Sequence, residues 1–450
     1  MNRQDLAREV RALALPAIAS SLLQTLVLVV DRAMLGHHGE SSLAAMQIAG
    51  PVEWSVWSIF SAFQVGTIAR VGRHVGAKNP AFAQRAARVS LGFALLAGVI
   101  VALASPSILG VIAMASPRAS AGVLEQARAY LGITLLASPV VFVSATAIAT
   151  LQAGGDTRTP LAIGIGVNLL HVAMNRVLIL GAFGLPALGA RGAAISTSVT
   201  FTLEALLSVG ALLQARRPAS LRGSVPGDMD AYVHEGRAIA HIAFPALLER
   251  MLYHAGYLAF VAILALLGDA PMAANQALLS VESICYLSAD GFGIAAAALV
   301  AQKLGAARPR DAVRAAQLST LYAVGLLTTM GIVAYAFHGA ALHVFSDDPQ
   351  IIAIGAAAFP LLVIAQPFNA TAAVLAHSLR GAGQTRPVLA VSAAGALVVR
   401  LAFTWMFVMK LGLGLTGVWL GSMCDWIVRS CLLVLIARAF ARSATAGHEP

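Results

Sequence analysis

Asp31 is the first residue of this chain whose type and position point to chemistry. It lies in an apolar run, Leu22 to Gly36, that resembles part of a membrane span. An ionised carboxylate in hydrocarbon costs at least about 2.5 kcal/mol, so this one is expected to face protein or water and to serve a function there. Arg32 is a poor partner for it, because adjacent residues on a helix point about 100° apart. We therefore expect Asp31 to have a function, and the rest of the chain indicates which function this is.

The composition predicts the surroundings of this carboxylate. Of the 450 residues, 59% are hydrophobic and 11% are charged, whereas soluble domains carry about 25% charged residues. Mean hydropathy is +0.81. The chain is therefore predicted to be an all-α polytopic membrane protein, and its apolar runs are too long and uniform for a spanning β-barrel. The net charge of +10 is expected to follow membrane topology, not nucleic-acid binding.

Apolar windows of about 20 residues, separated by charged or Gly/Pro-rich breaks, predict the transmembrane helices. The twelve predicted spans lie near residues 12–35, 48–69, 90–115, 129–151, 160–182, 191–214, 240–266, 273–300, 315–338, 351–377, 388–410 and 415–437.

The basic residues predict how these spans are oriented. With the N-terminus inside, most Lys and Arg between the spans also fall inside, and such an excess marks the cytoplasmic side. We therefore expect a multi-pass protein of the inner (plasma) membrane with both termini in the cytoplasm. The basic residues left in outside segments are Arg118, Arg128, Arg191 and Lys410.

The chain also repeats itself at an offset of 229 residues, at which VGRHVGAKNPAFAQRAARVS (71–90) matches VAQKLGAARPRDAVRAAQLS (300–319). Later, LQAGGDTRTPL (151–161) matches LRGAGQTRPVL (379–389). The repeat predicts an N-terminal lobe (1–214), a cytoplasmic linker (215–238) and a C-terminal lobe (239–450). Because each lobe has an even number of spans, the two six-helix lobes are expected to be related by pseudo-two-fold symmetry about the membrane normal.

Two such lobes leave a cleft between them that rocking can open to either side of the membrane. This architecture favours a transporter over a channel, which usually closes a ring of subunits around its pore. A membrane enzyme is disfavoured, because the chain has no HExxH and no GxSxG motif. It also has no GxxxxGK[ST] loop, which makes ATP drive within this chain unexpected.

Several stretches, in order along the chain, resemble the multidrug and toxic compound extrusion (MATE) family. They are LALPAIASSLLQTLVLVVDRAMLG, VGRHVGAKNP, LQAGGDTRTPL, VAQKLGAARP and LRGAGQTRPVL. Each motif is short, but their joint order and spacing cover essentially the whole chain. The resemblance implies an antiporter that exports an organic, often cationic, compound while a proton or sodium ion enters. Spans 7 and 10 lack acids where other branches carry them, which resembles the DinF-like branch.

The resemblance also implies a polar pocket of spans 1, 5 and 6 around Asp31. The usual span-5 pattern is an Asn and, four residues later, an Asp, whereas this chain has His171 and Asn175 at the matching positions. Loss of the carboxylate removes an oxygen ligand for sodium, and an imidazole is a group that titrates near neutral pH. Both differences favour a proton as the coupling ion. Thr197 matches a span-6 hydroxyl position and completes the predicted ion-coupling residues.

Structural explanations stay open for two of these residues. His171 can serve as a hydrogen-bonding residue between helices, and Thr197 as a packing hydroxyl. The predicted substrate contacts in this lobe are Asn168 and Gln24, which lies seven residues before Asp31 and so on the same helix face.

The second lobe repeats the scaffold but not the ionisable residues. At the same offset Asp31 falls on Phe260, so a titrating site is expected in one lobe only. Glu249, which follows Pro245 by four residues, and Glu282 are predicted substrate contacts. The role of the span-7 glutamate of other branches is not carried over to Glu249, because those branches have it one turn later.

Other charged residues within the predicted spans have simpler explanations. Asp290 lies eight residues after Glu282 and near the same helix face, while Arg176 and Arg400 are possible counter-charges. Asp425 and Arg429 have the i, i+4 spacing of a structural ion pair.

The function predicted from the sequence is secondary active antiport of organic compounds against inward protons, by alternating access of the two lobes, with Asp31 as the titrating group. A sodium-coupled exporter of the same family and a lipid-linked precursor flippase are the alternatives. No cofactor and no resident metal are expected beyond the coupling ion. The expected partners are small organic substrates and the lipid bilayer, and the expected state is a monomer.

Overall fold

The computed structural model describes residues 3–115, 120–223 and 229–446. Arg118 and residues 224–228 of the predicted linker lie outside these ranges. Within them all regular structure is helical and none is a strand, which confirms the predicted all-α class.

The helices follow one another with short connections. Their bounds are α1 (Arg3–His38), α2 (Glu40–Gly76), α3 (Pro80–Ala115), α4 (Ala121–Leu136), α5 (Ser138–Ala153), α6 (Arg158–Leu178), α7 (Ala190–Leu212), α8 (Met229–Ala265), α9 (Asp269–Gly305), α10 (Pro309–Ala336), α11 (His338–His343), α12 (Pro349–Gly381), α13 (Thr385–Ala393), α14 (Arg400–Trp405) and α15 (Gly414–Ala446), with π-helical segments η1 (Ala394–Val399) and η2 (Met406–Lys410).

Most helices extend beyond the spans predicted from hydropathy. Helix α8 begins at Met229, so residues 229–238 of the predicted linker are helical. The reason is that an apolar window detects only the segment that suits hydrocarbon. A helix can continue into water through polar residues without any apolar signal.

In the described residues, ten helices are long and apolar enough to cross a membrane, or eleven if the bent pair α4 and α5 forms one span. That pair bends by 54° at its break, next to Pro139. The predicted span 129–151 runs across this break, because hydropathy does not register a bend in the chain. Helix α2 covers the predicted span 48–69 but is too polar to be among the ten. A polytopic membrane fold is therefore confirmed, and the exact number of twelve spans stays a prediction.

The chain forms two compact units. Unit 2 consists of residues 23–243, and unit 1 consists of residues 1–22 together with 244–450. The predicted lobes divide the chain at the linker instead, so the descriptions differ for the start of α1 and the start of α8. Both of these helices contain an internal proline, Pro16 in α1 and Pro245 in α8, near the point where the chain passes from one unit to the other.

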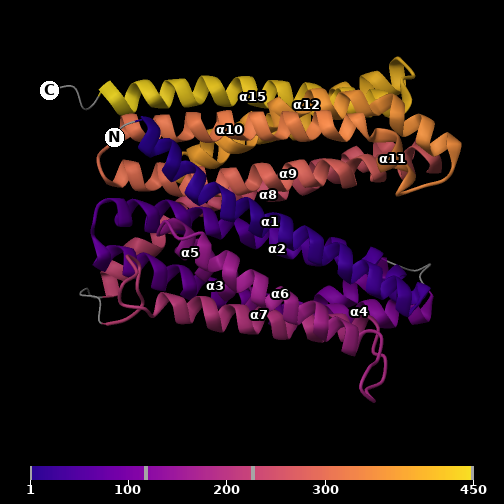
Figure 1. Cartoon of the computed structure of the whole chain (residues 1–450), viewed down its shortest axis with the longest axis horizontal. Helices are drawn as coiled ribbons and strands as arrows, with labels where there is room; N and C mark the ends of the chain where they lie inside the picture. Colours follow the sequence, from indigo (N-terminus) through magenta and orange to yellow (C-terminus); the bar gives the residue numbers. More distant parts are fainter. Residues whose placement is uncertain (1–2, 116–119, 224–228, 447–450) are drawn as a thin grey trace. The chain divides into compact units, whose positions relative to one another are not determined.

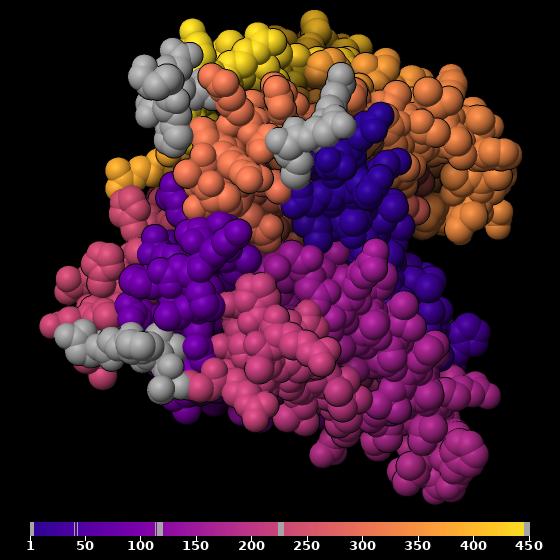
Figure 2. Space-filling view, turned by 60° about the vertical axis from the view of Figure 1, so that its left-hand side comes forward, coloured from indigo at the N-terminus to yellow at the C-terminus, as the bar shows by residue number. Residues whose placement is uncertain are grey.

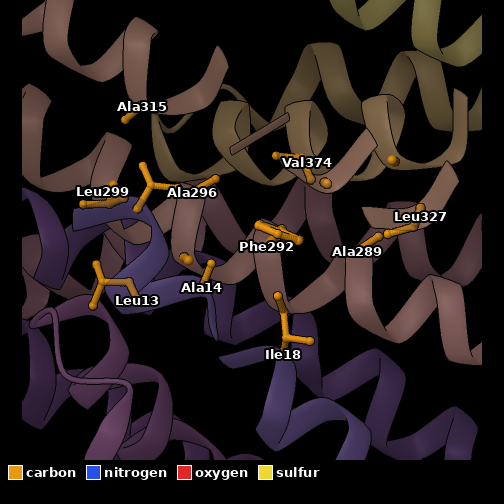
Figure 3. Close-up of a cluster of buried hydrophobic side chains, with 14 of the residues drawn as sticks. Leu13, Ala14, Ile18, Ala289, Phe292, Ala296, Leu299, Ala315, Leu327 and Val374 are labelled. Atoms are coloured by element: carbon orange, nitrogen blue, oxygen red, sulfur yellow. The ribbon is translucent and has the colours of Figure 1, made fainter. Parts of the chain in front are cut away.

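The core of unit 1 joins the first half of α1 to α9, α10 and α12. Figure 3 shows Leu13, Ala14 and Ile18 of α1 directed toward Phe292 and its neighbours on α9. Small residues allow close packing here, since a Cβ atom on Gly381 of α12 would collide with the backbone of α9. In Figure 1 the helices α9, α10, α12 and α15 of this unit run side by side along their lengths.

In unit 2 the helices α2 to α7 pack around their own apolar clusters. Helices α6 and α7 lie side by side on the face shown in Figure 2, in magenta and pink. Gly192 at the start of α7 sits against the backbone of Leu178 at the end of α6, where a Cβ atom would not fit. This close contact fixes the two helices that, with α1, carry the polar side chains described next.

Candidate functional site

Asp31 lies in the second half of α1, within unit 2. Its side chain is 21% exposed, whereas that of His171 is 4% exposed and Asn175 is completely buried. The carboxylate therefore lies at the edge of a buried polar group. His171 and Asn175 reach it together because they are four residues apart on one face of α6.

His171 and Asn175 both bind the Asp31 carboxylate. His171 Nε2 lies 2.9 Å from Oδ1 and 3.1 Å from Oδ2, and Asn175 Nδ2 donates to Oδ1 at 2.5 Å. Among the described residues, Asp31 pairs with His171 and not with the adjacent Arg32. The Asp31 carboxylate is therefore hydrogen-bonded from α6, the helix that the family resemblance indicated as its neighbour.

The other ring nitrogen of His171 faces two hydroxyl groups of α7. Nδ1 lies 3.1 Å from Ser196 Oγ and 3.2 Å from Thr200 Oγ1. Each hydroxyl also has a backbone acceptor within reach, at 3.2 Å from Ser196 Oγ to the His171 carbonyl and 2.8 Å from Thr200 Oγ1 to the Ser196 carbonyl. All three residues are buried.

This arrangement allows the His171 ring to keep its partners in two protonation states. In the neutral ring, Nε2–H donates to Asp31 and Nδ1 accepts from a hydroxyl of Ser196 or Thr200. In the imidazolium, Nδ1–H donates to the same oxygen atoms while both hydroxyls donate to their backbone carbonyls. Because buried polar groups need partners, a ring that loses none of them on protonation is suited to bind and release a proton.

Thr197 belongs to a neighbouring network, and in the part of the chain that the structure describes it makes no hydrogen bond with Asp31. Its hydroxyl hydrogen-bonds with Tyr130 of α4, and the Tyr130 hydroxyl donates to Glu53 Oε2 of α2 at 2.9 Å. Asp31 lies within electrostatic range of both Glu53 and Tyr130. A second acidic side chain, supplied from α2, therefore lies near the site.

Glu53 and Tyr130 were not predicted from the sequence. The signal for Glu53 was present, because it is an acidic residue inside the predicted span 48–69, which is the same argument that selected Asp31. No comparable signal marks Tyr130, since an aromatic residue in a span is usually a packing residue.

The two predicted substrate contacts of unit 2 are outside this hydrogen-bonded group. Gln24 is exposed on α1, and Asn168 is half-buried on α6. Asn168 lies beside Gly164, which also faces Leu23 of α1. Both residues are on the helices that carry Asp31 and His171, and in the described part of the chain neither hydrogen-bonds with Asp31.

The predicted substrate contacts Glu249 and Glu282 lie in unit 1. Glu249 Oε1 accepts hydrogen bonds from Arg380 of α12 at 2.6 Å and from Ser392 of α13 at 2.7 Å. Glu282 of α9 is half-buried and interacts electrostatically with Arg400. Among the described residues, no group of three or more His, Cys, Asp or Glu is arranged to hold a metal ion.

The fold and these buried polar groups define a class, that of multi-pass helical membrane transporters. The MatE family model matches the chain twice, over residues 16–177 and 245–406, and these matches begin 229 residues apart, the offset of the internal repeat. The chain therefore belongs to the MatE family.

Curated relatives and solved structures agree with this assignment. The chain is 27% identical over 431 residues to "Probable multidrug resistance protein NorM" of Thermotoga maritima, with 96% of this chain and 92% of that protein covered. It is also 27% identical over 328 residues to "FAD transporter" of Shewanella oneidensis, covering 72% and 71%. The structure titled "Outward-facing conformation of a multidrug resistance MATE family transporter of the MOP superfamily" has a TM-score of 0.87 at 18% identity and covers 98% of this chain and 97% of that chain. These relatives are transporters and not enzymes, so the chain is a membrane transporter.

Proposed function

We propose that this transporter exports organic, often cationic, compounds in exchange for inward protons, and that the Asp31–His171 pair binds the proton. The names of the multidrug resistance relatives support the substrate class. The observation that carries the proton is the contact of His171 Nε2 with both Asp31 oxygens, with hydroxyl groups behind the ring. The imidazole nitrogen is a poor ligand for a sodium ion, since hard cations prefer oxygen ligands.

In the proposed cycle the pair changes charge as the binding cleft faces outward. A proton arriving from outside binds to the pair and removes the net negative charge that favours a cationic substrate. Protonation of the imidazole turns its hydrogen bond to Asp31 into an ion pair, so the carboxylate is neutralised by its neighbour and no longer attracts a cationic substrate. The substrate then leaves, the transporter turns inward, and the proton is released to the cytoplasm.

One observation favours sodium as the alternative coupling ion. Within the described part of the chain, the Asn175 Oδ1 atom is buried and has no hydrogen-bond partner. This oxygen and the Asp31 carboxylate are ligands that a hard cation accepts. The rival is therefore an exporter that places a sodium ion between Asp31 and Asn175.

The two coupling ions are separated by imposing one gradient at a time. The purified protein is reconstituted in proteoliposomes, and movement of ethidium, an organic cation, is followed by fluorescence. We expect transport under a pH gradient without sodium and none under a sodium gradient at equal pH. Transport under the sodium gradient alone would contradict proton coupling.

The role of Asp31 is tested by Asp31→Asn, which keeps the shape of the side chain and removes its charge. We expect proton-driven ethidium transport to fall at least about tenfold, because the interaction that responds to the proton is lost. The unfolding temperature should stay close to that of the wild type. Asp347→Asn is the matched control, because the Asp347 side chain is fully exposed. Normal transport by Asp31→Asn would show that the scheme is wrong.

A further inference from the structure

A second pair of a histidine and a carboxylate lies in unit 1. His377 of α12 approaches Asp290 of α9, with Nε2 at 3.2 Å from Oδ1. The side chains of His377 and Asp290 are 19% and 28% exposed, so both remain reachable from outside the packed core. Neither residue takes part in the site around Asp31, which lies in unit 2.

The packing of α9 against α12 holds this pair in place. Gly293 lies three residues after Asp290 on α9, and a Cβ atom there would be 2.7 Å from the Cγ atom of the His377 ring. The missing side chain therefore leaves the space in which the ring lies against α9, next to the carboxylate. Further along, Gly381 of α12 packs directly on the backbone of Ala297 of α9, which fixes the distance between the helices.

The neighbouring acid on α8 is already neutralised. Glu249 Oε1 accepts hydrogen bonds from Arg380 and from Ser392, at 2.6 Å and 2.7 Å. Glu249 is therefore not available as a further partner of the imidazole. From α1, Ile18 packs against Gly291 of α9 and brings no charge.

Arg250 of α8 and the neutral Tyr286 of α9 also lie near this pair. Arg250 hydrogen-bonds with Tyr286 and interacts electrostatically with Asp290 and Glu249. Arg380 also interacts electrostatically with Asp290. The two arginines oppose a positive charge on the His377 ring, and the carboxylate that lies against the ring favours it.

The charges of this cluster balance when the imidazole is neutral, because two guanidinium groups face two carboxylates. The imidazole is the member whose ordinary chemistry places a change of charge near neutral pH. Protonation of His377 therefore converts a neutral cluster into one with a charge of +1, next to the carboxylate of Asp290.

We propose that His377 and Asp290 form a second proton-binding site of this transporter, held in unit 1 and separate from Asp31. The proton is carried on the imidazole, and Asp290 stabilises the resulting cation. Binding of this proton does not depend on the function proposed above. Its use in transport rests on that function and corresponds to a second proton in each cycle.

The proton is detected directly by NMR on the full-length protein with 13C-labelled histidine. The chain has 11 histidines, and His377→Gln identifies the resonance of His377 by its disappearance. We expect this resonance to follow a one-proton transition between about pH 5 and pH 8. In Asp290→Asn the transition should move about one unit or more toward lower pH, since the stabilising carboxylate is gone.

The exposed His343 provides the control, because its side chain is 60% exposed and lies on α11. His343→Gln should remove one resonance and leave the transition of His377 unchanged. A purely structural His377–Asp290 pair would show no transition in this range, or one that Asp290→Asn does not move, and either result would overturn the proposal. If His377→Gln does not fold, the proposal is tested by Asp290→Asn alone. In that variant a single histidine transition must shift relative to the wild type. Normal transport by Asp31→Asn would not affect this result, so the two proposals fail separately.

Discussion

At the scale of single residues, the Asp31 carboxylate is hydrogen-bonded by residues far away in the chain. His171 and Asn175 lie about 140 residues later and bind it from α6. Their i, i+4 spacing was visible in the sequence, and the family resemblance indicated their helix as the partner of α1. The hydroxyl groups behind the ring were not predicted, because Ser196 and Thr200 are two of many hydroxyl residues in α7.

The identity of the coupling ion is expected to follow the residues at positions 171 and 175. The double variant His171→Asn with Asn175→Asp restores the span-5 pattern usual in the family, adding a hard oxygen ligand and removing the imidazole. We expect ethidium transport to lose at least about 90% of its response to a pH gradient and to gain a response to a sodium gradient. The measurement is the proteoliposome assay with separate gradients. A double variant that still responds only to protons would assign the proton to Asp31 without His171.

At the scale of helices, α15 is tied to the preceding segment by one buried carboxylate. Asp425 of α15 is completely buried and lies 2.9 Å from Arg400 Nε of α14 and 2.5 Å from Arg429 Nε. Gly395 in the π-helical segment η1 packs on these side chains, and a Cβ atom there would collide with them. The i, i+4 pair of Asp425 and Arg429 was predicted from spacing. The participation of Arg400 required knowledge of how two helices pack.

Removal of this carboxylate is expected to destabilise unit 1. Asp425→Ala leaves the guanidinium groups of Arg400 and Arg429 in the span without their shared acid, and breaking a buried pair in this way costs about 3–5 kcal/mol. The unfolding temperature in detergent should therefore fall clearly below that of the wild type. Asp347→Ala, at a fully exposed position, should leave it unchanged. An unchanged unfolding temperature in Asp425→Ala would show that the three charges contribute no net stability.

Sequence reasoning located the helices better than it described their irregularities. The predicted span 388–410 is divided in the structure into α13, η1, α14 and η2. These π-helical interruptions could not be predicted, because hydropathy carries no information about π-helical turns. The same holds for the partner of Glu249, which is Arg380, 131 residues away. Apolar length and spacing along one helix are local properties, whereas side-chain pairing between helices depends on their three-dimensional packing.

At the scale of the whole molecule, the duplication seen in the sequence also appears in the family matches. Both matches begin at or near the equivalent prolines, at residues 16 and 245. The duplication could be predicted because loops and packing glycines repeat at a fixed offset. The boundaries of the compact units could not, because the first part of α1 packs with residues of the second half of the chain, and this is a property of tertiary packing.

The orientation in the membrane is predicted from the distribution of basic residues and is tested by labelling. Ala77, between α2 and α3, is exposed and expected in the cytoplasm, and Phe183, between α6 and α7, is 94% exposed and expected outside. Single cysteines are introduced as Ala77→Cys and Phe183→Cys after Cys285, Cys424 and Cys431 are replaced by Ala. A maleimide that cannot cross membranes should label Phe183→Cys in intact cells, and Ala77→Cys only after permeabilisation. The reverse pattern would place the N-terminus outside, which would contradict the excess of Lys and Arg in the segments assigned to the cytoplasm.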